Sequence, residues 1–195
     1  MTIPKLLAPA GNYEKFLAAL ENGADEIYMG LQKFNARGMT NNFTLAEYKQ
    51  ALNLAHIKGV KVYLTLNTIL RDEDIRESLN LLADLVASGL DGVIVQDLGL
   101  ATAIKQVFPD LPLHGSTQMT VHNIEGVRVL ERLGFKRVVL ARELTLEEIK
   151  EIRENTKVEL EVFIHGAACM SITGDYDLGS EDTIKLLEES FKTFC

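Results

Sequence analysis

The sequence lacks tryptophan, has four prolines, and contains only two cysteines among its 195 residues. Two cysteines, Cys169 and Cys195, cannot form the disulfide framework that stabilises small secreted domains. No run approaches the roughly 20 apolar residues that a membrane-spanning helix needs. The first residues, "MTIPKLLAPAG", do not show the charged and then apolar pattern of a signal peptide. We therefore expect a cytoplasmic protein with no membrane span.

Basic charge is also scarce, since the formal net charge is −8. An acidic balance argues against a broad basic surface for nucleic acid, although a local basic cleft would remain compatible with it. Three common chemical motifs are missing as well. Nothing resembles a phosphate-binding glycine-rich loop, a paired zinc-type cysteine set or a serine nucleophile elbow.

A repeated unit organises what is present. Four times an amphipathic stretch ends in glycine and a β-rich run follows, at Gly23, Gly59, Gly89 and Gly134. Glycine after a helix is typical of a left-handed C-terminal cap. Helix starts are marked by two capping boxes, "TLAE" at residues 44–47 and "TLEE" at residues 145–148. Asp72 and Ser180 are further predicted N-caps.

The pattern predicts alternating strands and helices. Strands are expected near residues 5–8, 26–30, 61–66, 92–96, 111–115, 137–141 and 159–164, with a last helix near 181–194. Such alternation implies a parallel sheet covered by helices. A repeat of roughly 25–35 residues favours a (β/α) barrel over an open flavodoxin-like sheet, which is the structural alternative.

We therefore predict the α/β class and an incomplete (β/α) TIM-barrel-like fold of about seven β-α units, with the eighth strand missing. The chain is expected to form a single domain over residues 1–195. An unclosed barrel exposes a strand edge, which the C-terminal helix or a second copy in a homo-oligomer should cover.

Polar residues follow most predicted strands, where the working residues of a β/α barrel lie. This predicted ring consists of residues 9–12, Gly30, Asn67, Gln96, Asp97, residues 116–118, Arg142, Glu143 and His165. Loops are polar in any protein, so a single member is weak support, but the ring as a whole favours a site. Arg142 could bind a carboxylate in bidentate fashion, with Glu143 beside it for proton transfer. The alternative is that these two residues simply pair with each other or with neighbouring residues.

The histidines are weaker candidates, because a lone histidine is more often a packing residue than a ligand. His114 and His165 are both predicted to end strands, whereas His56 and His122 are predicted on the surface of helices.

Four stretches together resemble peptidase family U32, the collagenase-like group. They are "APAGNYEKFLAALENGADEIYMG", "GSTQMTVHN", "LARELTLEEI" and "ELEVFIHGAACMS", and the resemblance runs over residues 4–171. It implies an incomplete or distorted barrel as an N-terminal domain, often followed by a C-terminal extension. It also implies either a peptidase or an oxygen-independent hydroxylase of RNA bases or of a quinone precursor. Such hydroxylases use a [4Fe-4S] cluster on four cysteines, with prephenate as the hydroxyl donor.

The first cluster cysteine of the family matches Cys169, and thiolates are the ligands that such clusters require. Tyr176 stands where the family has its second cysteine, and residues 172–195 form a divergent loop and helix without the later cysteine motifs. The surroundings of Cys195 do not match the family. This departure puts the cluster in doubt for this chain.

Three functions from different classes stay open. The first is a hydroxylase-type enzyme with Cys169 as a cluster ligand and a carboxylate pocket at Arg142. The second is a peptidase with Cys169 as nucleophile and His165 as base. The third is an inactive barrel fragment. Arg142 is the obvious cation of the ring, with Arg37 and Arg71 as loop candidates. This disfavours RNA and favours a small acidic, prephenate-like ligand or a peptide, bound through Asn67, Gln118 and Arg142.

Overall fold

In a computed structural model of the protein, residues 3–34 and 42–165 are described. They form seven strands in the order β1-β2-β3-β4-β5-β6-β7, six α helices and one 3-10 helix. The predicted fold class, an incomplete (β/α) TIM-barrel-like fold, is therefore confirmed. The predicted divergent segment 172–195, with its helix at 181–194 and the cap at Ser180, lies outside the described residues.

The chain divides into two compact units. The N-terminal unit is Pro4–His114, and the C-terminal unit is Gly115–Cys195 with Met1–Ile3. The short strand β5, Leu113–Gly115, lies at the division. Each unit is described by itself below.

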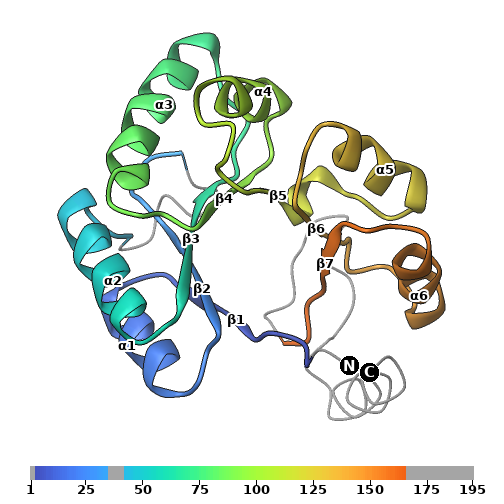
Figure 1. The fold of residues 1–195 in the computed structure, drawn as a ribbon, viewed down its shortest axis with the longest axis horizontal. Helices are drawn as coiled ribbons and strands as arrows, with labels where there is room; N and C mark the ends of the chain where they lie inside the picture. The colour runs from blue at the N-terminus through green and yellow to red at the C-terminus, as the bar shows by residue number, and fades with distance from the viewer. Residues whose placement is uncertain (1–2, 35–41, 166–195) are drawn as a thin grey trace. The chain divides into compact units, whose positions relative to one another are not determined.

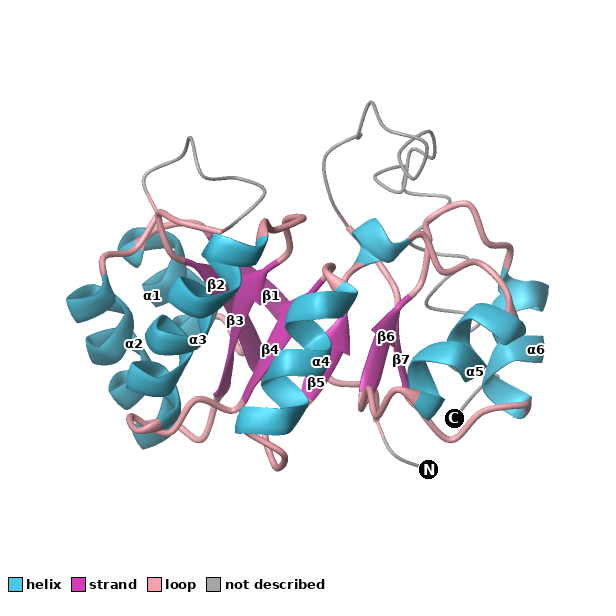
Figure 2. Ribbon diagram, turned by 90° about the horizontal axis from the view of Figure 1, so that it is seen from above, coloured by secondary structure: helices cyan, strands magenta, loops and turns pink. Residues whose placement is uncertain are grey.

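The N-terminal unit contains four parallel strands and four helices, with the helices on one side of the strands (Figure 1). Figure 2 shows the connecting loops gathered at the two ends of the strands. The strands are β1 (Leu7–Ala10), β2 (Glu26–Gly30), β3 (Lys61–Leu66) and β4 (Gly92–Val95), and the helices are α1 (Tyr13–Glu21), α2 (Leu45–Ile57), α3 (Asp72–Val86) and α4 (Leu98–Val107).

The C-terminal unit contains the parallel pair β6 (Arg137–Val139) and β7 (Glu159–Glu161). Helices α5 (Ile124–Arg132) and α6 (Leu146–Glu154) accompany them. A one-turn 3-10 helix, η1 (Thr117–Met119), follows β5. The order of elements is thus the β-α alternation that the sequence predicts.

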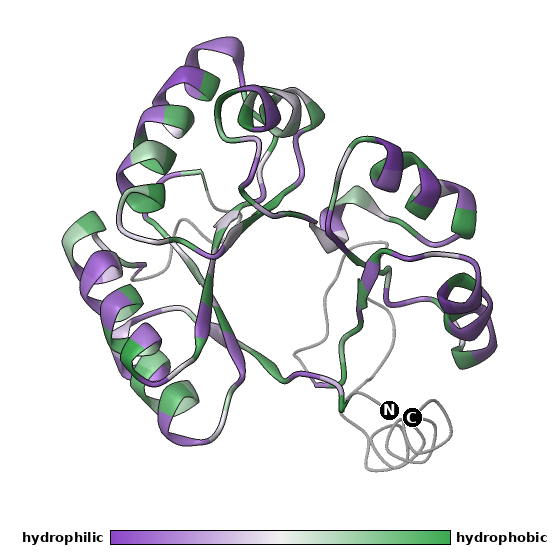
Figure 3. Cartoon of the chain, viewed as in Figure 1, coloured by the Kyte–Doolittle hydropathy of each residue, from purple (hydrophilic) through white to green (hydrophobic). Residues whose placement is uncertain are grey.

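Burial explains why the strands of the N-terminal unit have nearly continuous apolar runs. Every residue of β4 and five of the six residues of β3 are buried, as expected for parallel strands beneath helices. Each helix buries one face only, and Figure 3 shows hydrophobic and hydrophilic residues on the same helices. Helix α2 packs Tyr48, Ala51, Leu52 and Ala55 into the core. Among residues 3–34 and 42–165, no helix is long and apolar enough to cross a membrane.

The predicted helix ends are largely confirmed. The four repeat glycines have φ between 75° and 93°, the left-handed region that favours glycine. Thr44 with Glu47 and Thr145 with Glu148 form complete capping boxes. The prediction for Asp72 is wrong by one residue, because α3 begins at Asp72 and Arg71 is its N-cap. Asp74 fixes this start by accepting a hydrogen bond from the Arg71 main-chain N–H at 3.2 Å.

Candidate ligand-binding site

Two predicted ring residues of the N-terminal unit have structural roles. Asn12 is the N-cap of α1 and accepts a hydrogen bond from the Lys15 N–H at 2.9 Å. Asp97 is the N-cap of α4 and accepts from the Leu100 N–H at 2.8 Å. The second carboxylate oxygen of Asp97 accepts from the Leu70 N–H at 3.2 Å and so ties the β3-α3 loop to α4.

Other polar residues of the same unit are also engaged. Asn67 and Gln96 are half-buried, and each already takes part in an interaction. Arg71 is exposed and lies 3.8 Å from Glu73, the separation between Nη1 and Oε1. Arg37 lies outside the described residues. The strand ends of this unit therefore use their polar groups to build the fold.

The histidines largely follow the packing interpretation. His114 is the middle residue of β5 and does not end that strand; it is 2% exposed and packs against the ring of Tyr63 with centroids 4.5 Å apart. His56 lies on α2 and its Nε2 is 2.8 Å from Asp91 Oδ2. His122 is exposed, as predicted, but lies in the loop before α5 and not on a helix. His165 is exposed and follows the last residue of β7, Glu161, by four positions, so it does not end that strand.

In the C-terminal unit, the turn after β5 is tightly built. Ser116 is 2% exposed and its hydroxyl accepts a hydrogen bond from the Gln118 N–H at 3.2 Å. Thr120 ends η1 in the left-handed conformation, with φ of 54°. A threonine pays a steric cost there, on the order of 1–2 kcal/mol. The Thr117 hydroxyl oxygen in this turn is buried and has no hydrogen-bond partner. Gln118 is exposed and already engaged in an interaction.

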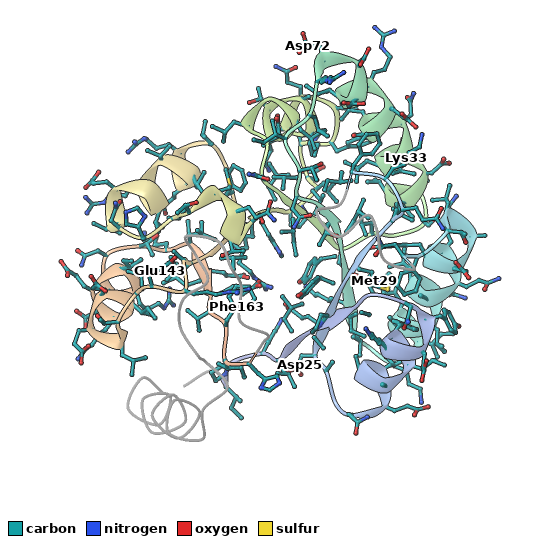
Figure 4. All side chains as sticks on the ribbon, turned by 180° about the vertical axis from the view of Figure 1, so that it is seen from behind. Asp25, Met29, Lys33, Asp72, Glu143 and Phe163 are labelled. Atoms are coloured by element: carbon teal, nitrogen blue, oxygen red, sulfur yellow. The ribbon has the colours of Figure 1, made fainter. Side chains whose placement is uncertain are left out.

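The segment after β6 contains Arg142 and Glu143. The Arg142 guanidinium lies 4.3 Å from the centre of the Phe163 ring, a cation–π arrangement. Arg142 Nε and both carboxylate oxygens of Glu143 are buried and make no hydrogen bond. The alternative in which Arg142 and Glu143 hydrogen-bond to each other or to neighbouring residues through these atoms is therefore not observed. Figure 4 labels Glu143 and Phe163 on the segments that follow β6 and β7.

A second arginine of the same unit, Arg137, has different surroundings from Arg142. Arg137 on β6 is also largely buried, but its Nη2 donates to Glu159 Oε2 at 2.9 Å, and its Nη1 lies 3.6 Å from Glu161 Oε2. A buried charge normally needs such compensation, because desolvation costs several kcal/mol per ion. Arg137 is compensated by carboxylates of β7, whereas Arg142 is half-buried and, within the described part of the chain, lies against the face of Phe163. Phe163 is not among the site residues predicted from the sequence, although its alternation with Glu161 along the chain could have placed both on one face.

No group of three or more metal-ligating side chains occurs in the part of the chain that the structure describes. Cys169 and Cys195 lie outside it.

The predicted site residues belong to different units: Asn67 belongs to the N-terminal unit, while Gln118, Arg142, Glu143 and His165 belong to the C-terminal unit. Among the described residues of the C-terminal unit, the buried side-chain atoms that make no hydrogen bond include Arg142 Nε, both carboxylate oxygens of Glu143 and the Thr117 hydroxyl.

A parallel β-α chain with polar residues after its strands is the arrangement of a β/α protein, in which functional residues lie at the C-terminal ends of the strands. Comparison with known families is more specific, since residues 11–179 match peptidase family U32. The chain belongs to this family, as the resemblance in its sequence implies.

Curated relatives differ in their names. The chain is 38% identical over 170 residues to a 23S rRNA 5-hydroxycytidine synthase of Escherichia coli, covering 87% of this chain and 25% of that protein. It is 36% identical to the tRNA hydroxylation protein P1 of Bacillus subtilis, covering 93% and 43%. It is also 32% identical to a protein named collagenase from Porphyromonas gingivalis, covering 87% and 43%. The chain thus spans less than half the length of these three relatives.

Among solved structures, the U32 peptidase Mk0906 is similar with a TM-score of 0.72 and 20% sequence identity. The similarity covers 87% of this chain and 72% of that one. At this level of identity the match shows the fold alone.

Proposed function

We propose that this chain binds a small acidic ligand of the prephenate type through Arg142 and Glu143, as part of a protein that hydroxylates a base in RNA. The observation that most directly supports this proposal is that Arg142 Nε and both carboxylate oxygens of Glu143, after β6, are buried and make no hydrogen bond. A buried polar group that makes no hydrogen bond costs about 1–3 kcal/mol, and more when it is charged. A ligand that pairs with these atoms would recover that cost on binding.

The chemistry of the two side chains favours an acid that also has a hydroxyl group. A guanidinium only donates and always carries charge, so its natural partner is a carboxylate. An ionised carboxylate only accepts, so Glu143 calls for a ligand group that donates, such as a hydroxyl. Phe163 beside Arg142 adds an apolar face on which a ring could rest. In a reaction, Glu143 could take the proton of that hydroxyl.

The RNA part of the proposal comes from the relatives. Two of the proteins named above are an rRNA hydroxycytidine synthase and a tRNA hydroxylation protein. The acidic net charge of this chain disfavours a broad RNA surface on these 195 residues. We therefore assign the small ligand to Arg142 and Glu143 as a co-substrate, with an RNA base as the second substrate. A substrate of this kind agrees with the cytoplasmic location expected from the sequence.

The [4Fe-4S] cluster implied by the family does not fit the residues at hand. Such a cluster takes four thiolates, and these 195 residues contain two cysteines. The described residues add no metal-ligating group. We derive no step through a cluster.

The peptidase alternative has no comparable support. His165 is exposed, and Cys169, its predicted nucleophile partner, lies outside the described residues. One relative is named collagenase, but no observation on this chain favours a catalytic pair. The Cys169–His165 pair stays a prediction, as do the inactive-fragment hypothesis and the homo-oligomer that covers the sheet edge.

Calorimetric titration of prephenate into the full chain and into Arg142→Gln tests the ligand assignment. Loss of a charge-assisted hydrogen bond should weaken binding about 10- to 100-fold. Arg128→Gln is the matched control, because Arg128 is an exposed arginine of the same unit that already pairs with Glu125. We expect it to bind within about twofold of the parent chain. Equal affinity for Arg142→Gln and the parent would contradict the assignment.

The RNA assignment needs a separate readout. The chain would be expressed in Escherichia coli lacking its tRNA hydroxylation protein P, a relative with 36% identity. Mass spectrometry of digested tRNA would then report any nucleoside that gains one oxygen atom. We expect a gain with the parent chain and none with Arg142→Gln. Absence of any gain, with the chain folded and abundant, would contradict the RNA part of the proposal.

A further inference from the structure

The Thr117 hydroxyl is a buried group that the fold itself does not use. The main-chain groups around it are satisfied: the Met119 N–H donates to Ser116 O at 3.0 Å, and the Thr120 N–H donates to Thr117 O at 2.9 Å. The Ser116 hydroxyl caps the turn. The Thr117 side-chain hydroxyl therefore plays no part in the hydrogen bonds that shape η1, yet it is buried without a partner. A hydroxyl is rarely buried in this way, because it loses its hydrogen bonds to water.

The turn that contains Thr117 is tied to the segment that contains Arg142. The Ala141 N–H donates to Val121 O at 2.9 Å. This bond joins the residue before Arg142 to the residue after Thr120. Both segments follow strands, so both lie at strand ends of the C-terminal unit. Hydroxyl, guanidinium and carboxylate thus come from two segments that are directly bonded to each other.

The backbone of the turn is strained where this connection is made. Thr120 has a β-branched side chain and a φ of 54°, next to Val121. Such conformations persist only where their surroundings fix them, and they cluster at ligand sites and catalytic sites. The strain is consistent with a turn held in place to present Thr117.

We infer that Thr117 is a third ligand contact beside Arg142 and Glu143 and determines which acids the site accepts. This inference rests on the proposed function. Arg142 Nε only donates and Glu143 only accepts, whereas the Thr117 hydroxyl can do both. It can therefore accept from, or donate to, the hydroxyl of a ligand whose carboxylate lies on Arg142. The ligand class is then a hydroxy acid, and an acid without the hydroxyl gains nothing from Thr117.

The test compares Thr117→Val, which removes the hydroxyl and keeps the shape, with Thr117→Ser, which keeps the hydroxyl. Two probes are titrated into the full chain: prephenate, and phenylpyruvate, which keeps the pyruvyl side chain and lacks both the ring hydroxyl and the ring carboxylate. We expect Thr117→Val to bind prephenate about tenfold more weakly. Its affinity for phenylpyruvate should be unchanged, and Thr117→Ser should bind both probes as the parent does. A purely structural role for Thr117 would not change one probe and spare the other.

Stability measurements and a second hydroxyl provide the controls. Thr117→Val should melt no lower than the parent, because it removes a buried hydroxyl that has no partner. Ser78 on α3 is another buried hydroxyl without a partner, and it belongs to the N-terminal unit. Ser78→Ala should bind both probes as the parent does.

The outcomes separate the two claims. Equal prephenate affinity for Thr117→Val and the parent, with Arg142→Gln weakened, would overturn the inference and leave the proposed function standing. An equal loss of both probes in Thr117→Val would also overturn it. If the parent chain binds neither probe, the proposed function fails and the inference fails with it.

Discussion

The two units differ in the hydrogen bonds that the polar residues at their strand ends make. In the N-terminal unit, Asn12 and Asp97 cap helices, and Asp97 also holds the loop after β3. In the C-terminal unit, Thr117, Arg142 and Glu143 present buried polar atoms that pair with nothing in the described chain. The first arrangement stabilises the fold, whereas the second costs stability, and this difference supports the ligand site that we propose in the C-terminal unit. Polar groups at strand ends become informative only when their partners are known.

The N-terminal unit does have buried hydroxyls without partners, but they lie elsewhere in the fold. Tyr48 on α2 and Ser78 on α3 are on helix faces that pack into the core. Burial, and then the charge of Asp91, raise the pKa of Tyr48 well above its usual value. The phenol is therefore neutral at all ordinary pH and acts as a core residue. The difference in hydrogen bonding between the two units therefore concerns the polar residues at their strand ends.

The largest effect is expected for Asp97→Ala in the N-terminal unit. It removes the cap of α4 and the acceptor for the Leu70 N–H, and should lower the free energy of unfolding by about 2 kcal/mol. Urea unfolding measures this loss, and Asp97→Asn, which retains a capping oxygen, should lose roughly half as much. Prephenate affinity of the folded variant should stay within about twofold of the parent. A tenfold loss of affinity would contradict a purely structural role for Asp97.

An opposite and smaller effect is expected for Glu143→Met in the C-terminal unit. Replacing a buried carboxylate that has no partner by an apolar side chain of similar length should raise the free energy of unfolding by about 1 kcal/mol. The same variant should lose prephenate binding. Urea unfolding and titration are measured on the same sample.

The control for Glu143→Met is Glu147→Met, because Glu147 is exposed in the first turn of α6. It should change stability by less than about 0.5 kcal/mol. A clear destabilisation by Glu143→Met would mean that the carboxylate has a partner in the folded protein.

The smallest effect concerns the two capping boxes, one of which lies in each unit. Glu47 and Glu148 have pKa values below the ordinary 4.5, because the main-chain N–H and then the hydroxyl of Thr44 or Thr145 donate to each carboxylate. A carboxyl whose pKa is lowered by folding stabilises the protein above its unfolded pKa. That stabilisation is lost as the pH falls from about 4.5 through the lowered value.

Glu47→Gln and Glu148→Gln should each reduce slightly the dependence of unfolding free energy on pH below 4.5. The change should be a little larger for Glu148, whose pKa the charge of His122 also lowers. Unfolding curves from pH 5 down to about pH 3 measure it. A pH dependence identical to that of the parent in both variants would show that the boxes do not form in solution.

Local patterns in the sequence predict the fold well. The repeat glycines and the two Thr-Glu boxes act within one turn of a helix, so neighbouring residues determine them, and the structure confirms all of them. Strand ends are less predictable. The strand expected at 159–164 ends at Glu161, because a run of β-forming residues says nothing of where the partner strand stops.

The candidate site could be predicted only as a set of residues. Asp97 and Glu143 look alike in the sequence, since each is an acid that follows a buried strand. What separates them is whether a distant N–H, such as that of Leu70, lies within reach. Phe163 is missed for the same reason, because its significance depends on Arg142, a residue on another segment. Tertiary contacts decide which polar residues build the fold and which are left for a ligand.

The most direct test of this account is a crystal structure of the chain grown with prephenate. We expect a ligand carboxylate on Arg142 Nε and the ligand hydroxyl within hydrogen-bond distance of the Glu143 carboxylate. A structure in which Arg142 Nε and Glu143 bind other protein groups, with the ligand absent or held elsewhere, would contradict the account.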